Sequence, residues 1–138
     1  MKYKFIEDLT SDVLFEAYGK NLKEVFGNAA SALFSIICKT DKIRAKKVKK
    51  VEVKANGLPE LMFNWLQELI ALVDTDELFF SKFEILEIDK NGKYLKAKCY
   101  GEPITPEKGE TVVKAVTYYK YKFEKTKKSY KARVSLDI

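Results

Sequence analysis

Histidine is absent from this chain, and cysteine occurs only twice, at Cys38 and Cys99, with no CxxC motif. A zinc site needs about four Cys or His ligands, so any metal ion here must be a hard cation held by oxygen atoms. The sequence also lacks a nucleophile-elbow serine, a glycine-rich phosphate loop and a paired acid motif on a helix. These absences indicate a protein that is not an enzyme, and the two cysteines are expected to be small core residues.

Long apolar runs are also missing. The longest, such as LIALV at 69–73, fall far short of the roughly 20 residues that a membrane span requires. The N-terminal MKYKFIED alternates charged and apolar residues without the apolar stretch of a signal peptide, so we expect a cytoplasmic location and no membrane partner. With 138 residues, 46% hydrophobic and 33% charged, the composition is typical of one soluble domain with a real core.

Two segments carry apolar residues at the spacing of an amphipathic helix. The first follows Asn21, and with Glu24 three residues later it has the form of a capping box. Its apolar positions share the i, i+3, i+4, i+7 spacing: Leu22, Val25, Phe26, Ala29, Ala30, Leu33, Phe34 and Ile37. The second runs from Leu58 to Val73, with Pro59 suited to a first turn. Both segments are predicted to be helices.

The other segments have β-strand patterns. Residues 3–8 and 13–18 are two short strands, a lysine-rich strand precedes Asn56-Gly57, and Asn91-Gly92 marks a hairpin. A last hairpin turns in EKTKKS, and alternate residues from Val113 to Phe123 are expected on one face of its first strand. The predicted fold class is α+β: a single domain over 1–138 with two layers, a mostly antiparallel or mixed β-sheet and two main helices packed on it.

Aspartates stand near both ends of the chain. Asp12 opens the second predicted strand, and Asp137 ends the last one beside Ile138, whose α-carboxylate is a further negative group. If these strands are neighbours, three carboxylates converge, and such a cluster would hold a hard divalent cation. The alternatives are that the aspartates are solvated strand ends, or that Lys or Arg side chains neutralise them.

The chain is basic, with a net charge of +6. Seven basic residues crowd into segment 42–54: Lys42, Arg44, Lys46, Lys47, Lys49, Lys50 and Lys54. They could contact phosphates or protect a solvated edge strand. Segment 118–123 mixes tyrosines with lysines, as a nucleic-acid face does, although tyrosine is also an ordinary core residue of strands. Direct RNA binding through these two segments is therefore one candidate function.

Several stretches together resemble one family. They are AYGK at 17–20, NAA and LF in the first helical segment, WLQEL, DTDEL and FSKF in the second and its following strand, KAVTY at 114–118, and the closing RVSLDI. This combination, which runs nearly end to end, resembles archease, the small protein that assists the RtcB-type RNA ligase. The resemblance implies a protein cofactor that promotes guanylylation and repeated turnover of the ligase in tRNA splicing and RNA repair, with tRNA reached indirectly through the ligase.

The resemblance also implies a divalent-cation site. The first candidate for the bound ion is calcium, and the alternatives are that magnesium or manganese occupies the site in the working protein. The ligands would be Asp12, Asp137 and the terminal Ile138. Lys114 of KAVTY matches the family's functional lysine and is expected to contact the partner. The chain departs from the family pattern where a histidine is usual, at Leu9 and Tyr119, so roles of those histidines are not expected here.

Overall fold

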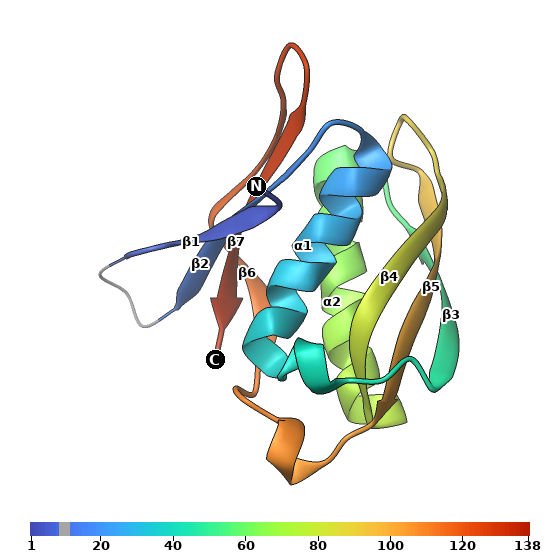
Figure 1. Ribbon diagram of the computed structural model, residues 1–138. Coiled ribbons are helices and arrows are strands. Elements are labelled where there is room, and N and C mark those ends of the chain that lie inside the picture. The colour runs from blue at the N-terminus through green and yellow to red at the C-terminus, as the bar shows by residue number, and fades with distance from the viewer. Residues whose placement is uncertain (9–11) are drawn as a thin grey trace.

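The computed structural model describes residues 1–8 and 12–138, which form two helices and seven strands. Figure 1 shows their arrangement. In chain order the elements are β1 Tyr3–Ile6, β2 Val13–Gly19, α1 Leu22–Ile37, β3 Lys47–Lys54, α2 Leu58–Asp76, β4 Leu78–Ile88, β5 Tyr94–Pro103, β6 Ala115–Lys125 and β7 Tyr130–Asp137. Short 3₁₀ turns occupy Thr40–Lys42 and Pro106–Lys108. The helices and strands that the sequence predicts are all present.

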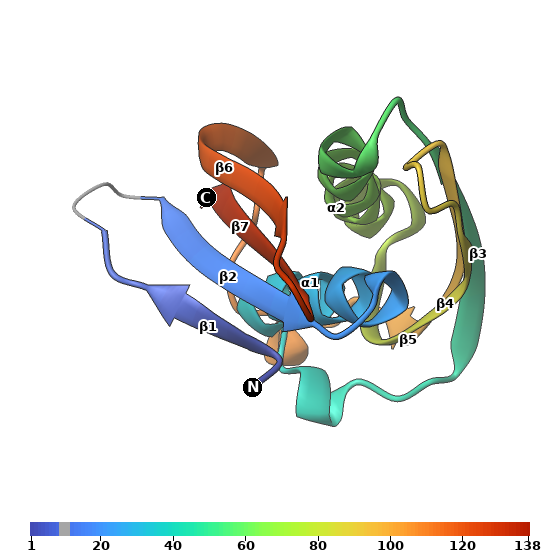
Figure 2. The ribbon, with the colours of Figure 1, turned by 90° about the horizontal axis from the view of Figure 1, so that it is seen from above.

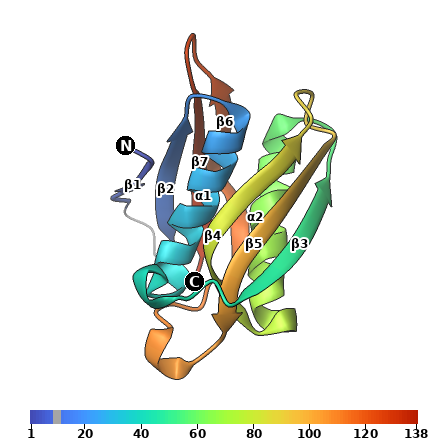
Figure 3. The ribbon, with the colours of Figure 1, turned by 45° about the vertical axis from the view of Figure 1, so that its right-hand side comes forward.

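The strands form two separate antiparallel sheets. One has the order β1-β2-β7-β6 and the other β3-β5-β4. Figures 2 and 3 show α1 and α2 between these sheets. The α+β class and the antiparallel pairing are confirmed, whereas the helices lie between two sheets and not on one. The helices lie between the sheets because the apolar side chains cover a wide part of each helix surface. In α1 the buried residues include Ala32, which lies outside the predicted apolar stripe, so each sheet covers part of the apolar surface.

The start of α1 is fixed by its cap. The side chain of Asn21 accepts a hydrogen bond from the Glu24 amide at 2.9 Å, as the capping-box pattern predicts. The Glu24 carboxylate accepts the Lys20 amide at 3.4 Å, one residue before the usual partner. Further along, Trp65 of α2 is fully buried and donates its indole N–H to the Phe26 carbonyl at 3.0 Å, which joins the two helices.

Strand β6 contains a large bulge. It pairs with β7 as Thr117 with Ser135 and next as Lys122 with Arg133, so the four residues 118–121 of β6 oppose the single residue Val134 of β7. Lys120 takes a positive φ of 52° inside this bulge. The prediction that alternate residues from 113 to 123 share one face of the strand is therefore wrong, because the bulge interrupts the alternation of side chains between the two faces.

Both cysteines are buried in the core, as predicted, and burial raises the pKa of each thiol to about 12. In the part of the chain that the structure describes, no helix is long and apolar enough to cross a membrane.

Candidate functional site

The β2–β7 register brings the two predicted aspartates to one place. The ladder ends with Val13 paired to Leu136, so Asp12 and Asp137 are the next residues along the two strands at this end of the sheet. Leu136 faces the core with 0% exposure, so Asp137 lies on the opposite, outer face of the sheet. The hydroxyl of Ser135, which shares that face, donates to an Asp12 carboxylate oxygen at 3.4 Å. Asp12 therefore lies over the outer face near Asp137.

A further oxygen atom belongs to this end of the sheet. Thr117 of β6 pairs with Ser135, so its side chain shares the outer face. The Thr117 hydroxyl oxygen is buried, and it has no hydrogen-bonding partner among the described residues. A buried polar atom without a protein partner is costly, so this hydroxyl is available to an ordered water or to a ligand. The donors on this face are all hard oxygens, the kind that calcium, magnesium and manganese prefer.

The β6 bulge reaches across the outer face. Tyr119 donates its hydroxyl to Asp8 at 3.2 Å, and the Lys120 ammonium lies 2.9 Å from the same carboxylate. Asp8 follows β1, at the opposite edge of the sheet from β6. Leu14 of β2 is only 4% exposed although it lies outside the contiguous core, and its cross-strand partner Ser135 is fully buried. The bulge therefore covers the outer face beside Asp12.

The charge of Asp8 is well compensated. Its side chain is 7% exposed, and its hydrogen bond raises the pKa of Lys120, helped by Tyr119 and by the negative charge of Asp8 itself. Lys120 therefore keeps its proton, and its ion pair with Asp8 clamps the bulge over the sheet.

Lys114 and Ile138 lie at the same end. The Lys114 amide donates to the Asp137 carbonyl at 2.7 Å, just before the Ala115–Asp137 pair, which places the two chain segments side by side. The Lys114 side chain is exposed, and Ile138 is 41% exposed. The exposed Lys114 side chain, whose backbone lies beside Asp137, is accessible to a partner's surface.

The predicted site residues thus lie at the same end of the sheet. They are Asp12, Asp137, Ile138 and Lys114. Leu9, at which the resemblance also led us to expect a histidine, lies outside the described residues. Among the residues that are described, no three His, Cys, Asp or Glu side chains form a metal-ligating group. The candidate cation site consists instead of two aspartates, the α-carboxylate of Ile138 and nearby hydroxyls, and this set of hard oxygens fits a divalent cation.

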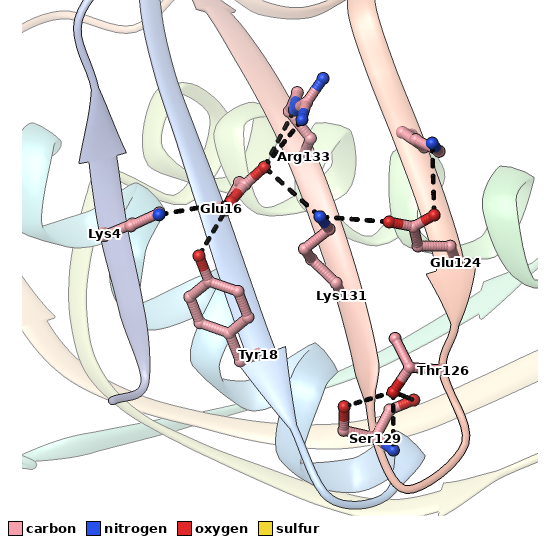
Figure 4. A network of polar contacts seen from close by, with 9 residues as sticks. Lys4, Glu16, Tyr18, Glu124, Thr126, Ser129, Lys131 and Arg133 are labelled. Carbon is pink, nitrogen blue, oxygen red and sulfur yellow. Dashed lines mark hydrogen bonds and ion pairs between the residues drawn. The ribbon is translucent and has the colours of Figure 1, made fainter.

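Further along the same outer face, Glu16 gathers a network of charges (Figure 4). Its carboxylate is 7% exposed and accepts hydrogen bonds from Tyr18 at 2.8 Å and from Arg133 at 3.0 Å. Burial acts to raise the pKa of Glu16, but these hydrogen bonds and the charges of Lys131 and Arg133 outweigh it and hold the pKa below its ordinary value. Lys131 also contacts Glu124 at 3.1 Å, so the network continues to β6.

Comparison with known proteins shows which family has this sequence and fold. The model of the Archease protein family matches residues 3–138. The chain is 43% identical to an archease of Methanosarcina acetivorans over 99% of this chain and 96% of that protein, and 42% identical to one of Pyrococcus abyssi over 84% of each. This chain belongs to the archease family.

Two solved structures have the same fold. The solution structure of protein 1598 of Methanobacterium thermoautotrophicum has a TM-score of 0.84 and 34% identity, covering 99% of each chain. The crystal structure of a Thermotoga maritima archease, described as a possible chaperone, has a TM-score of 0.65 and 20% identity over 96% of this chain and 95% of that one. The second likeness shows the shared archease fold alone.

Sequence reasoning about this archease missed Asp8, Thr117 and Ser135. The strand register could have suggested Ser135, because it lies two residues before Asp137 on the same face. No local pattern could have suggested Asp8, whose contact with Tyr119 depends on the bulge. Tyr119 stands where the family resemblance led us to expect a histidine. Its hydroxyl, a hydrogen-bond donor without histidine's proton chemistry near neutral pH, binds Asp8.

The two predicted basic segments have ordinary structural roles. Segment 42–54 ends in β3, which is an edge strand as predicted, and Lys49 pairs with Asp76 at 2.8 Å. In segment 118–123, Tyr121 packs beside Phe63 of α2 and donates its hydroxyl to the Pro59 carbonyl at 2.6 Å. Tyr118 stacks on Phe63 at 4.2 Å between ring centres but remains 74% exposed. The core-packing alternative is therefore confirmed for Tyr121.

Proposed function

We propose that this archease is a non-enzymatic cofactor that activates an RtcB-type RNA ligase, promoting its guanylylation and its repeated turnover. The observation that carries the proposal is that the β2–β7 register and the Ser135–Asp12 hydrogen bond bring Asp12 to the end of the sheet where Asp137 lies. The exposed Lys114 beside them supplies a cationic contact for the partner. RNA, including tRNA, is then reached through the ligase.

The proposed cofactor is a divalent cation, calcium in the first place, held by Asp12, Asp137 and the α-carboxylate of Ile138. When bound, the ion supplies positive charge that offsets the charge of phosphate groups. The protein's own residues perform the rest. Ser135 orients the Asp12 carboxylate through its hydroxyl, and the clamp between Asp8 and Lys120 keeps the bulge over that end of the sheet.

A small partner can accelerate nucleotidyl transfer without chemistry of its own, because such transfer depends mainly on positioning and on charge stabilisation. The partner must bind the guanylylation-competent state of the ligase more tightly than the spent state. A tenfold difference in affinity is worth about 1.4 kcal/mol and shifts the population of the ligase by the same factor. The carboxylate end and Lys114 are the proposed source of this difference.

The test is guanylylation of an RtcB-type ligase from the same source, with substoichiometric amounts of this protein. The wild-type chain should stimulate the reaction, and Asp12→Asn and Asp137→Asn should each lose most of the stimulation. Asp41→Asn, which removes the same charge from an exposed 3₁₀ turn, is the matched control and should stimulate as the wild type does. If both site variants remain folded and stimulate normally, the proposal is wrong.

A second candidate is direct RNA binding through segments 42–54 and 118–123. The observation that favours it is the exposure of Tyr118, whose ring is held in place on Phe63 with its interplanar angle at 7° and is 74% exposed. Such a ring can stack on a nucleotide base. This function predicts salt-dependent RNA binding in the absence of the ligase. The single variant Tyr118→Ala and the double variant Lys47→Ser with Lys50→Ser should each weaken that binding.

A further inference from the structure

A basic cleft opens at the end of the molecule opposite Asp137, where the β6–β7 hairpin faces the start of α1 (Figure 1). Its volume is about 640 Å³. Five of its lining residues are lysines: Lys20, Lys23, Lys125, Lys127 and Lys128. We call this surface the lysine cleft. No carboxylate side chain lines it, and the acid nearest the helix start, Glu24, is not a lining residue.

No carboxylate neutralises the lysines of this cleft in the described part of the chain. Within residues 1–8 and 12–138, none of the five forms an ion pair, and all five are exposed. Lys49, Lys120 and Lys131, by contrast, each lie close to a carboxylate that offsets their charge. Five like charges around one hollow raise the free energy of the folded chain and create a strong positive potential, which an anionic ligand would relieve.

Two further features favour an anion. The cleft includes Leu22 and Lys23, the first residues of the 16-residue helix α1, whose amides have no acceptor within the helix. The hairpin turn that carries Lys127 and Lys128 is held in shape, since the Thr126 amide donates to the Ser129 carbonyl at 2.8 Å and the two hydroxyls lie 2.7 Å apart (Figure 4). The charges are therefore presented by ordered backbone.

We propose that the lysine cleft binds the phosphate backbone of RNA. Lysine is a compact point charge that suits phosphate contact without reading sequence, and a cleft of this size with five charges exceeds what one small anion needs. The choice of RNA over other phosphate polymers rests on the proposed function. The seven residue steps from Tyr130 to Asp137 span about 23 Å at about 3.3 Å each, so RNA would be held well away from the carboxylate end.

The test compares two pairs of substitutions that each remove two exposed lysines. Lys127→Ser with Lys128→Ser alters the lysine cleft, and Lys47→Ser with Lys50→Ser alters the β3 edge. Binding of a single-stranded RNA is measured by fluorescence anisotropy at several salt concentrations. If all five lysines contact phosphates, the wild-type affinity should fall about 100-fold from about 50 to about 200 mM salt, against about 20-fold for the cleft pair, while the β3 pair behaves as the wild type.

Three results would overturn the proposal. They are no salt-dependent RNA binding by the wild-type chain, equal weakening by both substitution pairs, and binding to vesicles of anionic lipid without binding to RNA. Guanylylation of the ligase alone, which needs no RNA, separates this inference from the proposed function. The cleft pair should stimulate guanylylation as the wild type does, so loss of RNA binding with intact stimulation implicates the cleft and leaves the ligase function standing.

Discussion

Arg133 of β7 places both its Nε and its Nη2 atoms 3.0 Å from one carboxylate oxygen of Glu16, its cross-strand partner on β2. The Glu16 side chain is 7% exposed and that of Arg133 33%. A carboxylate withdrawn from water in this way depends on its partner, because the lost hydration must be replaced. The pair therefore joins the two central strands that also carry Asp12 and Asp137.

Arg133→Gln should lower the free energy of unfolding by about 2 kcal/mol, because it leaves the buried Glu16 carboxylate with weaker partners. Lys122→Gln is the matched control, since Lys122 is 56% exposed and pairs with a partly exposed Glu124. It should change stability by less than about 0.5 kcal/mol. Urea denaturation measures both variants, and equal losses would mean that the Glu16 pair has no special role.

The pH dependence of stability should show the same pair. Hydrogen bonds and nearby charges outweigh burial and hold the folded-state pKa of Glu16 below its ordinary value of 4.5. The resulting stabilisation is complete above about pH 4.5 and is lost as the pH falls through the lower folded-state pKa. The stability difference between wild type and Glu16→Gln should therefore shrink on acidification in urea titrations. A difference that grows toward low pH would contradict the assignment.

Much of the fold follows from local patterns. The stripe after Asn21 and the Asn91-Gly92 turn predicted α1 and a hairpin correctly, because spacing and turn chemistry act over a few residues. The β6 bulge was not predictable, since the alternation of residues 113–123 continues unbroken in the sequence while the pairing with β7 shifts. The contact of Tyr119 with Asp8 depends on that shift.

Of the two candidate sites, one was predictable from the sequence and the other was not. Asp12 and Asp137 were predicted because each stands at the end of a strand, and the pairing of β2 with β7 then places them at the same end of the sheet. The lysine cleft was not, because Lys20 and Lys127 are about a hundred positions apart and only the fold brings them to one surface. Segment 42–54, which is unusually basic, became an edge strand with part of its charge paired. Local charge density therefore did not locate the basic cleft.

Glycine 101 should tolerate no side chain. A Cβ there would lie within 3.0 Å of the Phe79 carbon and oxygen and of Phe80 on the neighbouring strand β4, so backbone would have to move. Gly101→Ala should destabilise the protein by about 3 kcal/mol or more. Gly27→Ala is the control, because a Cβ at this position of α1 meets nothing within 4 Å, and it should stabilise by about 0.5–1 kcal/mol. Thermal unfolding of the two variants should shift in opposite directions.

Tyr119→Phe should loosen the bulge. The substitution removes the hydrogen bond to Asp8, whose side chain is 7% exposed, and a bond to such a charged group contributes about 1.5–3 kcal/mol. Tyr118→Phe is the control, since the Tyr118 hydroxyl has no partner in the described part of the chain and its ring stacking on Phe63 is kept. Amide hydrogen exchange across 117–122 should accelerate in Tyr119→Phe only. Unchanged exchange in that variant would mean that the Lys120–Asp8 pair alone holds the bulge.

Calcium should stabilise the protein through Asp137. A ligand at 100 times its dissociation constant adds about 2.7 kcal/mol to the free energy of unfolding, so calcium should raise the melting temperature of the wild-type chain. Asp137→Asn should lose this rise. In the absence of calcium the same variant should be at least as stable as the wild type, because it relieves repulsion between carboxylates that the β2–β7 register brings together. A purely structural Asp137 would instead lower stability equally with and without calcium, so differential scanning fluorimetry under the two conditions distinguishes a ligand from a structural residue.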